Sequence, residues 1–219
     1  MIQAIIFDMD GLMIDTEKLL LRYWLEAAHH YGYDMKREHA LGIRSLAAKY
    51  AVPKLKAQLG EDFDYQKVRA LRLRMMNEHI ETYGLEEKPG LGELLEYLKE
   101  HHYKTAVATA TDPERTKRYL GSLNRLTYFD QIVCASMVES GKPAPDIYLE
   151  AAARLGTEPC ECMALEDSPN GIMAAYRAGM RPVMVPDLTG PDADTEKLVY
   201  RCVKDLSEVI PVLEECGKC

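Results

Sequence analysis

Four carboxylates in this sequence follow two short apolar runs that have the character of buried strands. Asp8 and Asp10 follow the first run, and Glu166 and Asp167 follow the second. Because the carboxyl ends of parallel strands meet at one edge of a sheet, we expect these side chains to converge. Any one of them could simply cap a helix, but four bare carboxylates together would repel by several kcal/mol at an effective dielectric constant of about 20. Oxygen ligands in small number favour Mg²⁺, so the sequence predicts a magnesium site.

Hydroxyl groups are predicted at the same edge. Thr109 and Thr111 follow the next strand-like segment. The run Thr111–Glu114 is typical of a helix start with a proline in the first turn, so the N-terminus of that helix would face the site. Lys142 precedes a proline, and a lysine in that context, taken alone, is more often a solvated loop residue.

Strand-like and helix-like segments alternate over most of the chain, which predicts an α/β fold with a doubly wound parallel sheet. The strand-like segments are short, continuous apolar runs, as expected for strands buried on both faces. They are Ala4–Phe7, Thr105–Ala108, Gln131–Cys134, Met163–Leu165 and Pro182–Val185. The core helices are predicted at Leu91–His101, Glu114–Leu120, Pro145–Leu155 and Pro169–Ala178.

Residues 17–88 break this alternation, because they contain helical patterns and no convincing strand. The predicted helices are Lys18–Tyr31, Arg44–Leu59, with Pro53 as a kink or boundary, and Tyr65–Tyr83. A helical block of this length is too long for a crossover connection. We therefore predict a helical cap subdomain, residues 17–88, inserted into a catalytic core of residues 1–16 and 89–219. Pro89–Gly90 marks the return to the core.

The composition is that of a soluble globular protein, with 47% hydrophobic and 28% charged residues among 219. Lys and Arg number 27 against 35 Asp and Glu, which gives a net charge of −8 and disfavours nucleic acid or an anionic membrane as a partner. No apolar stretch approaches the roughly 18 residues of a membrane span, and the N-terminus lacks a signal-peptide pattern. We expect a cytoplasmic monomer that acts on a small phosphorylated metabolite.

Six cysteines also fit a reducing compartment, since a chain of this size needs no disulfides. Cys216 and Cys219 have the C-x-x-C spacing of a redox or zinc motif. A thioredoxin-type motif follows a strand and opens a helix, whereas this pair lies in the last four residues. An incidental tail is the favoured interpretation.

The segment Asp8–Thr16 resembles the first motif, D-x-D-G-[ILV]-x-x-[DN]-[ST], of the haloacid dehalogenase superfamily. The other three motifs of that family are matched in order by Thr109, by Lys142 and by Glu166–Gly171. The strings G-K-P-x-P-D and E-D-S-x-x-G are similar to those of the β-phosphoglucomutase-like branch. The resemblance covers the whole chain and implies a Rossmann-like core with a helical cap.

The resemblance implies a role for each motif residue. Asp8 is the implied nucleophile, which forms an aspartyl-phosphate, and Asp10 is the implied general acid and base. A dehalogenase expels halide without a proton and lacks the second aspartate, so Asp10 argues for phosphate chemistry. Thr109 and Lys142 would bind the transferring phosphoryl group. Gly11 would let the loop turn tightly beside it.

The remaining implied roles concern the metal and the substrate. Asp8, Asp10, Glu166 and Asp167 form the implied Mg²⁺ site, in which Glu166 binds directly or through water. Thr111 is expected to contact substrate beside Thr109. In the cap, Arg44 lies in a glycine-containing loop, where it could hold a second phosphate or sugar hydroxyls; the alternative is a solvated arginine at a helix start.

Three functions remain open. The first is a Mg²⁺-dependent phosphatase acting on a small phosphate monoester, in particular a phosphosugar. The second is a phosphomutase of the β-phosphoglucomutase type, and the third is a non-catalytic protein that binds a phosphorylated ligand. The third is disfavoured because every motif residue is present. The sequence carries Leu20 where the mutases have histidine and Asp112 where they have lysine. Loss of a cation weakens the hold on a bisphosphate intermediate, so the phosphatase is favoured.

Overall fold

Six parallel strands form the centre of the larger part of the molecule in the computed structural model, which describes residues 1–44 and 46–217. Their order in the sheet is β3-β2-β1-β4-β5-β6, which is the order of a doubly wound nucleotide-binding fold. The predicted α/β class is therefore confirmed. The strands are β1 (Ala4–Phe7), β2 (Lys104–Thr109), β3 (Gln131–Cys134), β4 (Cys162–Glu166), β5 (Arg181–Met184) and β6 (Arg201–Cys202).

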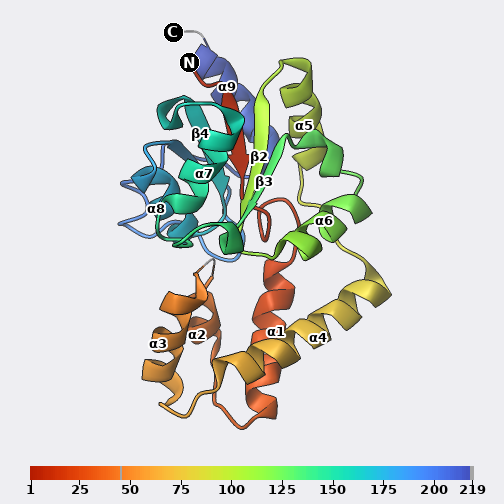
Figure 1. Ribbon diagram of the computed structural model, residues 1–219, viewed down its shortest axis with the longest axis vertical. Helices are drawn as coiled ribbons and strands as arrows, with labels where there is room; N and C mark the ends of the chain where they lie inside the picture. The colour runs from red at the N-terminus through yellow and green to blue at the C-terminus, as the bar shows by residue number, and fades with distance from the viewer. Residues whose placement is uncertain (45, 218–219) are drawn as a thin grey trace.

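The four residues of β1 are fully buried because the two faces of the sheet are both covered. Successive strand side chains point to opposite faces, so Ile5 and Phe7 join one apolar cluster and Ala4 and Ile6 join the other. One face is covered by α5 (Leu91–Glu100), α6 (Pro113–Ser122) and α9 (Val209–Gly217); the other by α7 (Asp146–Leu155) and α8 (Pro169–Arg177). Figure 1 shows the two layers on either side of the sheet.

Two helices of the core begin at residues whose side chains cap them. Asp112 accepts a hydrogen bond from the backbone N–H of Arg115 at the start of α6, with Pro113 in the first turn. Ser168 accepts one from the N–H of Gly171 at the start of α8. Both helices therefore begin directly after strand ends, with their N-termini at the edge where the motif residues gather.

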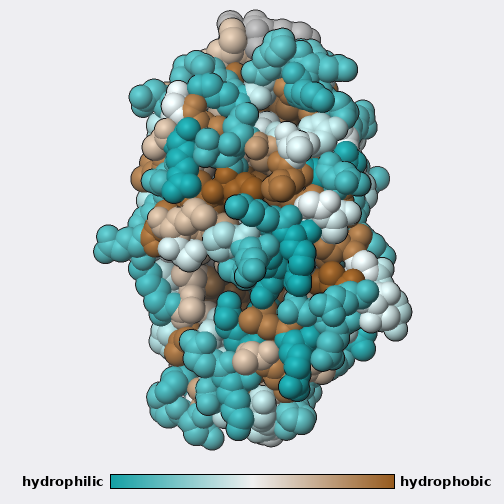
Figure 2. Space-filling model, turned by 45° about the vertical axis from the view of Figure 1, so that its right-hand side comes forward, coloured by the Kyte–Doolittle hydropathy of each residue, from teal (hydrophilic) through white to brown (hydrophobic). Residues whose placement is uncertain are grey.

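The second part of the molecule is a helical cap at the opposite end from the chain termini (Figure 1). Helices α1 and α4 pack against each other, and an apolar cluster that includes Trp24, Leu55, Val68 and Leu71 holds the cap together. Over the face drawn in Figure 2, hydrophilic side chains predominate on the cap and hydrophobic ones gather in patches nearer the middle of the molecule. The cap helices are α1 (Glu17–His30), α2 (Arg37–Leu41), α3 (Ala48–Leu59) and α4 (Tyr65–Tyr83).

Two chain segments connect the cap to the core, and they run side by side. The N–H of Asp15 donates to the carbonyl of Glu86 at 2.9 Å, and the N–H of Lys88 donates to the carbonyl of Met13 at 2.9 Å. Lys18 joins both segments through ion pairs with Asp15 and Glu86. The division of the chain at residues 16/17 and 88/89 stays a prediction.

The structure corrects the predicted helix Arg44–Leu59. Helix α3 begins only at Ala48 and continues through Pro53, and a separate short helix, α2, precedes it. The segment between them is bonded to the core instead: the N–H of Ala47 donates to the carbonyl of Lys142 at 3.1 Å. The carbonyl of Arg44 likewise accepts from Asn170.

Two elements near the C-terminal end of the described chain were not indicated by the sequence patterns. β6 and α9 extend the sheet and cover it at the C-terminal end of the described chain. Cys216 is buried at the end of α9, whereas Cys219 lies outside the described residues, so the C-x-x-C spacing is not tested. Among residues 1–44 and 46–217, no helix is both long and apolar enough to cross a membrane.

Candidate active site

A buried ion pair between Asp8 and Lys142 lies where β1 ends. Each residue is 2% exposed. The ammonium group of Lys142 donates to Oδ1 of Asp8 and, at 2.9 Å, to the carbonyl oxygen of Ala108; it also lies 2.6 Å from Oε1 of Glu166. Lys142 is therefore fixed by three oxygen atoms from three neighbouring strand ends, and its charge faces the two carboxylates.

Glu166 and Asp167 bring two further carboxylates from the end of β4. One oxygen each of Asp8, Glu166 and Asp167 lies within 4.8 Å of the others. Glu166 is held in place by the hydroxyl of Tyr148, which donates to Oε1 at 2.6 Å, and by that of Ser168, which donates to Oε2 at 3.3 Å. The predicted convergence of carboxylates at this edge of the sheet is therefore present for these three.

Glycines allow this close approach of loop and carboxylates. Gly11 has φ +88°, and a Cβ there would lie 2.3 Å from Oδ2 of Asp167. A Cβ on Gly171, in the first turn of α8, would lie 1.9 Å from the carboxyl carbon of Glu166. Either substitution would require the carboxylate to move, because real Cβ contacts are never so short.

Burial away from water is the largest influence on the pKa values of the groups in the cluster. Burial raises the pKa of Asp8 well above its ordinary value, although Lys142 opposes the shift. Burial and then the charge of Glu17 raise the pKa of Asp167 well above its ordinary value. Burial also raises the pKa of Glu17 to about 8, against the opposing charge of Arg44. Burial lowers the pKa of Lys142, but the carboxylates outweigh it and leave that pKa above its ordinary value. The cluster therefore holds more carboxylates than its cations balance.

Asp10 lies apart from this cluster and faces two hydroxyl groups. Thr16 donates to its Oδ1 at 2.6 Å and Thr111 donates to its Oδ2 at 2.7 Å. Thr109 is fully buried at the end of β2, and its hydroxyl oxygen accepts from the N–H of Thr111 at 3.1 Å. The carboxylate of Asp10 is not among the three that could share a metal in the described part of the chain. Its role as a metal ligand stays a prediction.

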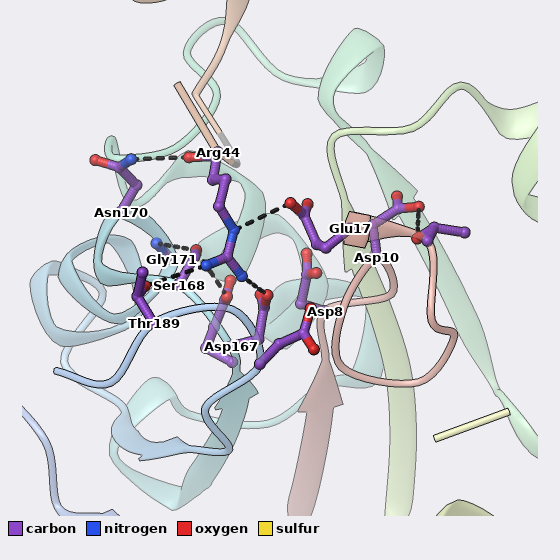
Figure 3. Close-up of polar contacts among 12 residues, drawn as sticks. Asp8, Asp10, Glu17, Arg44, Asp167, Ser168, Asn170, Gly171 and Thr189 are labelled. Atoms are coloured by element: carbon purple, nitrogen blue, oxygen red, sulfur yellow. Dashed lines mark hydrogen bonds and ion pairs between the residues drawn. The ribbon is translucent and has the colours of Figure 1, made fainter. Parts of the chain in front are cut away.

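Arg44 reaches from the cap into the carboxylate cluster (Figure 3). It is 7% exposed, its Nη2 donates to Oδ2 of Asp167, and its Nε donates to Oε2 of Glu17 at 3.0 Å. Its Nη1 donates to the hydroxyl of Thr189 at 3.2 Å. The alternative of a solvated arginine is therefore wrong, and substrate binding by Arg44 stays a prediction. Glu17, the first residue of α1, accepts one of these hydrogen bonds from Arg44, and the sequence patterns did not single it out.

Between the cap and the sheet edge lies a cavity of about 530 Å³, a size typical of small-molecule sites. Asp8, Asp10 and Thr111 line it from the core. Trp24 and Arg72 line it from the cap. The cavity therefore connects the carboxylate cluster to cap side chains that can contact the remainder of a substrate.

Two buried oxygens show that the cluster fits a cation. Oδ2 of Asp8 and Oδ1 of Asp167 are buried and have no hydrogen-bond partner within residues 1–44 and 46–217. A buried unpaired carboxylate oxygen costs free energy, and a bound cation removes that cost. The donor set of Asp8, Glu166 and Asp167 consists of oxygen alone, which suits a hard divalent ion rather than zinc or copper.

Comparison with known proteins gives one family and several phosphatases. Residues 5–185 match the family model of the haloacid dehalogenase-like hydrolases. The chain is 32% identical over 215 residues to the "Phosphorylated carbohydrates phosphatase" of Thermotoga maritima, covering 97% of this chain and 99% of that one. It is 34% identical over 192 residues to the fructose-1-phosphate phosphatase YqaB of Escherichia coli, covering 83% and 95%. A crystal structure of β-phosphoglucomutase from Clostridium difficile superposes with a TM-score of 0.82 at 23% identity, covering 98% and 96%, and shows the shared fold.

Three features together define a phosphoryl-transfer hydrolase. They are a doubly wound sheet with a helical cap, an aspartate buried beside a lysine, and a carboxylate pair at the end of the neighbouring strand. The chain belongs to the haloacid dehalogenase-like hydrolases, and within them it is a phosphatase of the type that cleaves phosphoric monoesters.

Proposed function

We propose that this protein is a Mg²⁺-dependent phosphatase that hydrolyses a small sugar phosphate through an aspartyl-phosphate at Asp8. The observation that carries the proposal is the pairing of Asp8 with Lys142 at one end of a cavity whose opposite wall belongs to the cap. The relatives that cleave phosphorylated carbohydrates and fructose 1-phosphate support the substrate class. The substrate is the expected partner, and we propose a cytoplasmic monomer.

Asp8, Glu166 and Asp167 would hold the magnesium ion. When bound, Mg²⁺ neutralises the charge of these carboxylates and of the substrate phosphate, so that one anion can approach another. Lys142 balances the charge that remains on Asp8 and on the phosphoryl group. The hydroxyl of Thr109 and the N–H groups at the start of α6 donate to the phosphoryl oxygens.

In the first step an oxygen of Asp8 attacks phosphorus. The Oδ–P bond forms, the bond from phosphorus to the sugar oxygen breaks, and that oxygen takes a proton from Asp10. In the second step a water molecule gives a proton to Asp10 and attacks phosphorus, which breaks the Oδ–P bond and releases phosphate. Thr16 and Thr111 orient the carboxyl of Asp10 for both transfers.

The phosphomutase is the second candidate function, since the fold is shared with β-phosphoglucomutase. Leu20 lines the cavity with an apolar side chain at the place where the mutases carry histidine. Asp112 caps α6 and pairs with Arg115 at 3.4 Å, so it adds a negative charge where the mutases carry a cation. Both features weaken the retention of a bisphosphate intermediate through a half-turn.

Phosphate release from a panel of sugar phosphates, set beside isomerisation of β-glucose 1-phosphate in the presence of glucose 1,6-bisphosphate, tests the proposal. We expect phosphate release without isomerisation. Isomerisation faster than phosphate release would establish the mutase, and neither activity in metal-loaded protein would leave only a ligand-binding protein.

A further inference from the structure

Helix α4 presents two arginines to the cavity, and neither has an acidic partner among the described residues. Positions Tyr65, Arg69, Arg72 and Met76 recur at helical spacing and line the cavity from the cap. Neither Arg69 nor Arg72 forms an ion pair with any carboxylate of residues 1–44 and 46–217. On the core side, Arg115 from α6 lines the same cavity; its side chain is 17% exposed and, unlike the two arginines of α4, has an acidic partner, Asp112, at 3.4 Å.

Arg72 is an unusual buried cation. It is 6% exposed, and its Nε is buried without a hydrogen-bond partner within the described chain. Its guanidinium lies over the ring of Trp24 at 5.0 Å, which supplies a cation–π contact but no counter-charge. Burial, followed by repulsion from Arg69 and then a smaller contribution from Arg115, lowers the pKa of Arg72 to about 10, although Tyr65 and the charge of Asp10 oppose the shift. A charge in this position costs free energy in the ligand-free protein.

The other buried cations of the site do not share this property. Lys142 faces Asp8 and Glu166, and Arg44 faces Glu17 and Asp167. The chain carries a net charge of −8, so carboxylates are abundant, yet none pairs with Arg69 or Arg72 in the part of the chain that the structure describes. An anionic group of the ligand would supply the counter-charge that Arg69 and Arg72 lack.

We propose that Arg69, Arg72 and Arg115 form a subsite for a second anionic group of the substrate, on the side of the cavity that α4 and the start of α6 line together. The inference rests on the proposed phosphatase function and narrows it. One end of the substrate carries the phosphate that Asp8 attacks, and the other end carries a phosphate or a carboxylate. The substrate class is therefore a sugar or polyol bisphosphate, or a phosphorylated sugar acid.

Matched substrate pairs test this subsite. Fructose 1,6-bisphosphate is compared with fructose 1-phosphate, and 6-phosphogluconate with sorbitol 6-phosphate. We expect the member with two anionic groups to have at least about tenfold higher kcat/KM, mainly through a lower KM, as for one charge-assisted hydrogen bond. A preference within the first pair alone assigns the subsite to phosphate, and within the second pair alone to carboxylate. Equal kcat/KM within both pairs overturns the proposal, although the phosphatase itself stands.

Variants of α4 test whether its arginines cause the preference for the doubly anionic substrate. Arg69→Gln should reduce the preference for the doubly anionic substrate about tenfold, since the side chain is only partly buried and its replacement should fold. Arg74→Gln, on the exposed side of the same helix, is the matched control and should retain the preference. Equal preferences in both variants and the parent protein would overturn the assignment to α4.

The two possible roles of Arg72, binding of a ligand and support of the cap, predict opposite changes in stability when the charge is removed. Arg72→Met removes a buried, unpaired charge and keeps the side-chain length, so the ligand-free protein should unfold at a higher temperature than the parent protein. A lower unfolding temperature would mean that Arg72 supports the cap rather than a ligand.

Calorimetric binding of fructose 1,6-bisphosphate to the Asp8→Asn protein, with and without Arg69→Gln, separates the two proposals. Weaker binding in the double variant supports the subsite even if no substrate is hydrolysed, in which case the phosphatase proposal fails alone. Unchanged binding contradicts the subsite.

Discussion

Replacement of Arg44 by methionine tests how the carboxylate cluster is balanced. Arg44 is 7% exposed and pairs with Glu17 and Asp167, so its removal leaves two buried carboxylates without their cation. Removing one partner of a buried ion pair costs about 3–5 kcal/mol. Because the raised pKa values of both carboxyls allow them to take up a proton, we expect the lower end of that range. For a chain of this size that loss lowers Tm by roughly 6–12 °C.

Magnesium should reverse part of this loss. In the parent protein the guanidinium of Arg44 pairs with Oδ2 of Asp167, and its positive charge competes electrostatically with a metal ion at the unpartnered Oδ1. Without the guanidinium this competition is absent, so saturating Mg²⁺ should raise Tm more in Arg44→Met than in the parent protein. The assay is thermal unfolding followed by circular dichroism, with each protein measured in EDTA and in excess Mg²⁺.

The control is Arg22→Met, which removes an exposed pair with Glu26 on α1 and should leave Tm unchanged. A loss of less than about 1 kcal/mol for Arg44→Met in EDTA would refute the reasoning, since it would lie in the range of a surface pair. An equal rise of Tm with Mg²⁺ in both proteins would refute the competition for Asp167.

Four further predictions concern the chemistry. Asp8→Asn should abolish turnover while Tm is retained, because it neutralises one of several crowded carboxylates; residual turnover above about a thousandth of the parent rate would exclude Asp8 as the nucleophile. Asp10→Asn should slow sugar phosphates more than aryl phosphates, which need no proton on the leaving oxygen; equal losses in kcat would exclude that role. Gly171→Ala should weaken Mg²⁺ binding measured by calorimetry, since the new Cβ would lie 1.9 Å from the carboxyl carbon of Glu166; unchanged affinity would mean that Glu166 does not contact the ion. EDTA should abolish activity, Mg²⁺ should restore it and Ca²⁺ should inhibit, because Ca²⁺ prefers more ligands at longer distances; turnover by verified metal-free protein would contradict this.

Buried strands were the part of the fold that the sequence predicted best. β1 and β3 have the predicted bounds, because each is a short apolar run bracketed by turn or cap residues: Asp8 follows β1, and a stretch rich in serine, glycine and proline follows β3. β6 was missed because it consists of two exposed residues, Arg201 and Cys202, and carries no apolar signal. α9 was missed because its apolar residues form a continuous run around Pro211 rather than a helical period.

Site residues close to a motif could be predicted, whereas contacts across the cap could not. Asp8, Lys142 and Asp167 come together because each follows a strand of one sheet, and the edge is common to all three. The contact of Arg44 with Asp167 joins residues 123 positions apart, and no local pattern encodes it. Helix propensity instead favoured a helix from Arg44 onward, and tertiary bonds of the cap loop to the core overrode it.

Tyr148 illustrates an intermediate case. It lies within the predicted helix Pro145–Leu155, where an aromatic residue at helical spacing indicates packing against the sheet. Its ring is indeed fully buried, but its hydroxyl also donates to Glu166. The polar role depends on where the strand end lies relative to the helix, which the spacing does not specify.

In the proposed mechanism Asp8 carries the phosphoryl group during turnover. Acid quenching in the steady state, followed by borohydride reduction, converts an aspartyl-phosphate to homoserine, which peptide mass spectrometry can assign to one position. We expect homoserine at position 8 with Mg²⁺ and a sugar phosphate present, and an unmodified aspartate when substrate or metal is omitted. Homoserine at another position, or none at any position during measured turnover, would contradict the role of Asp8 as the nucleophile.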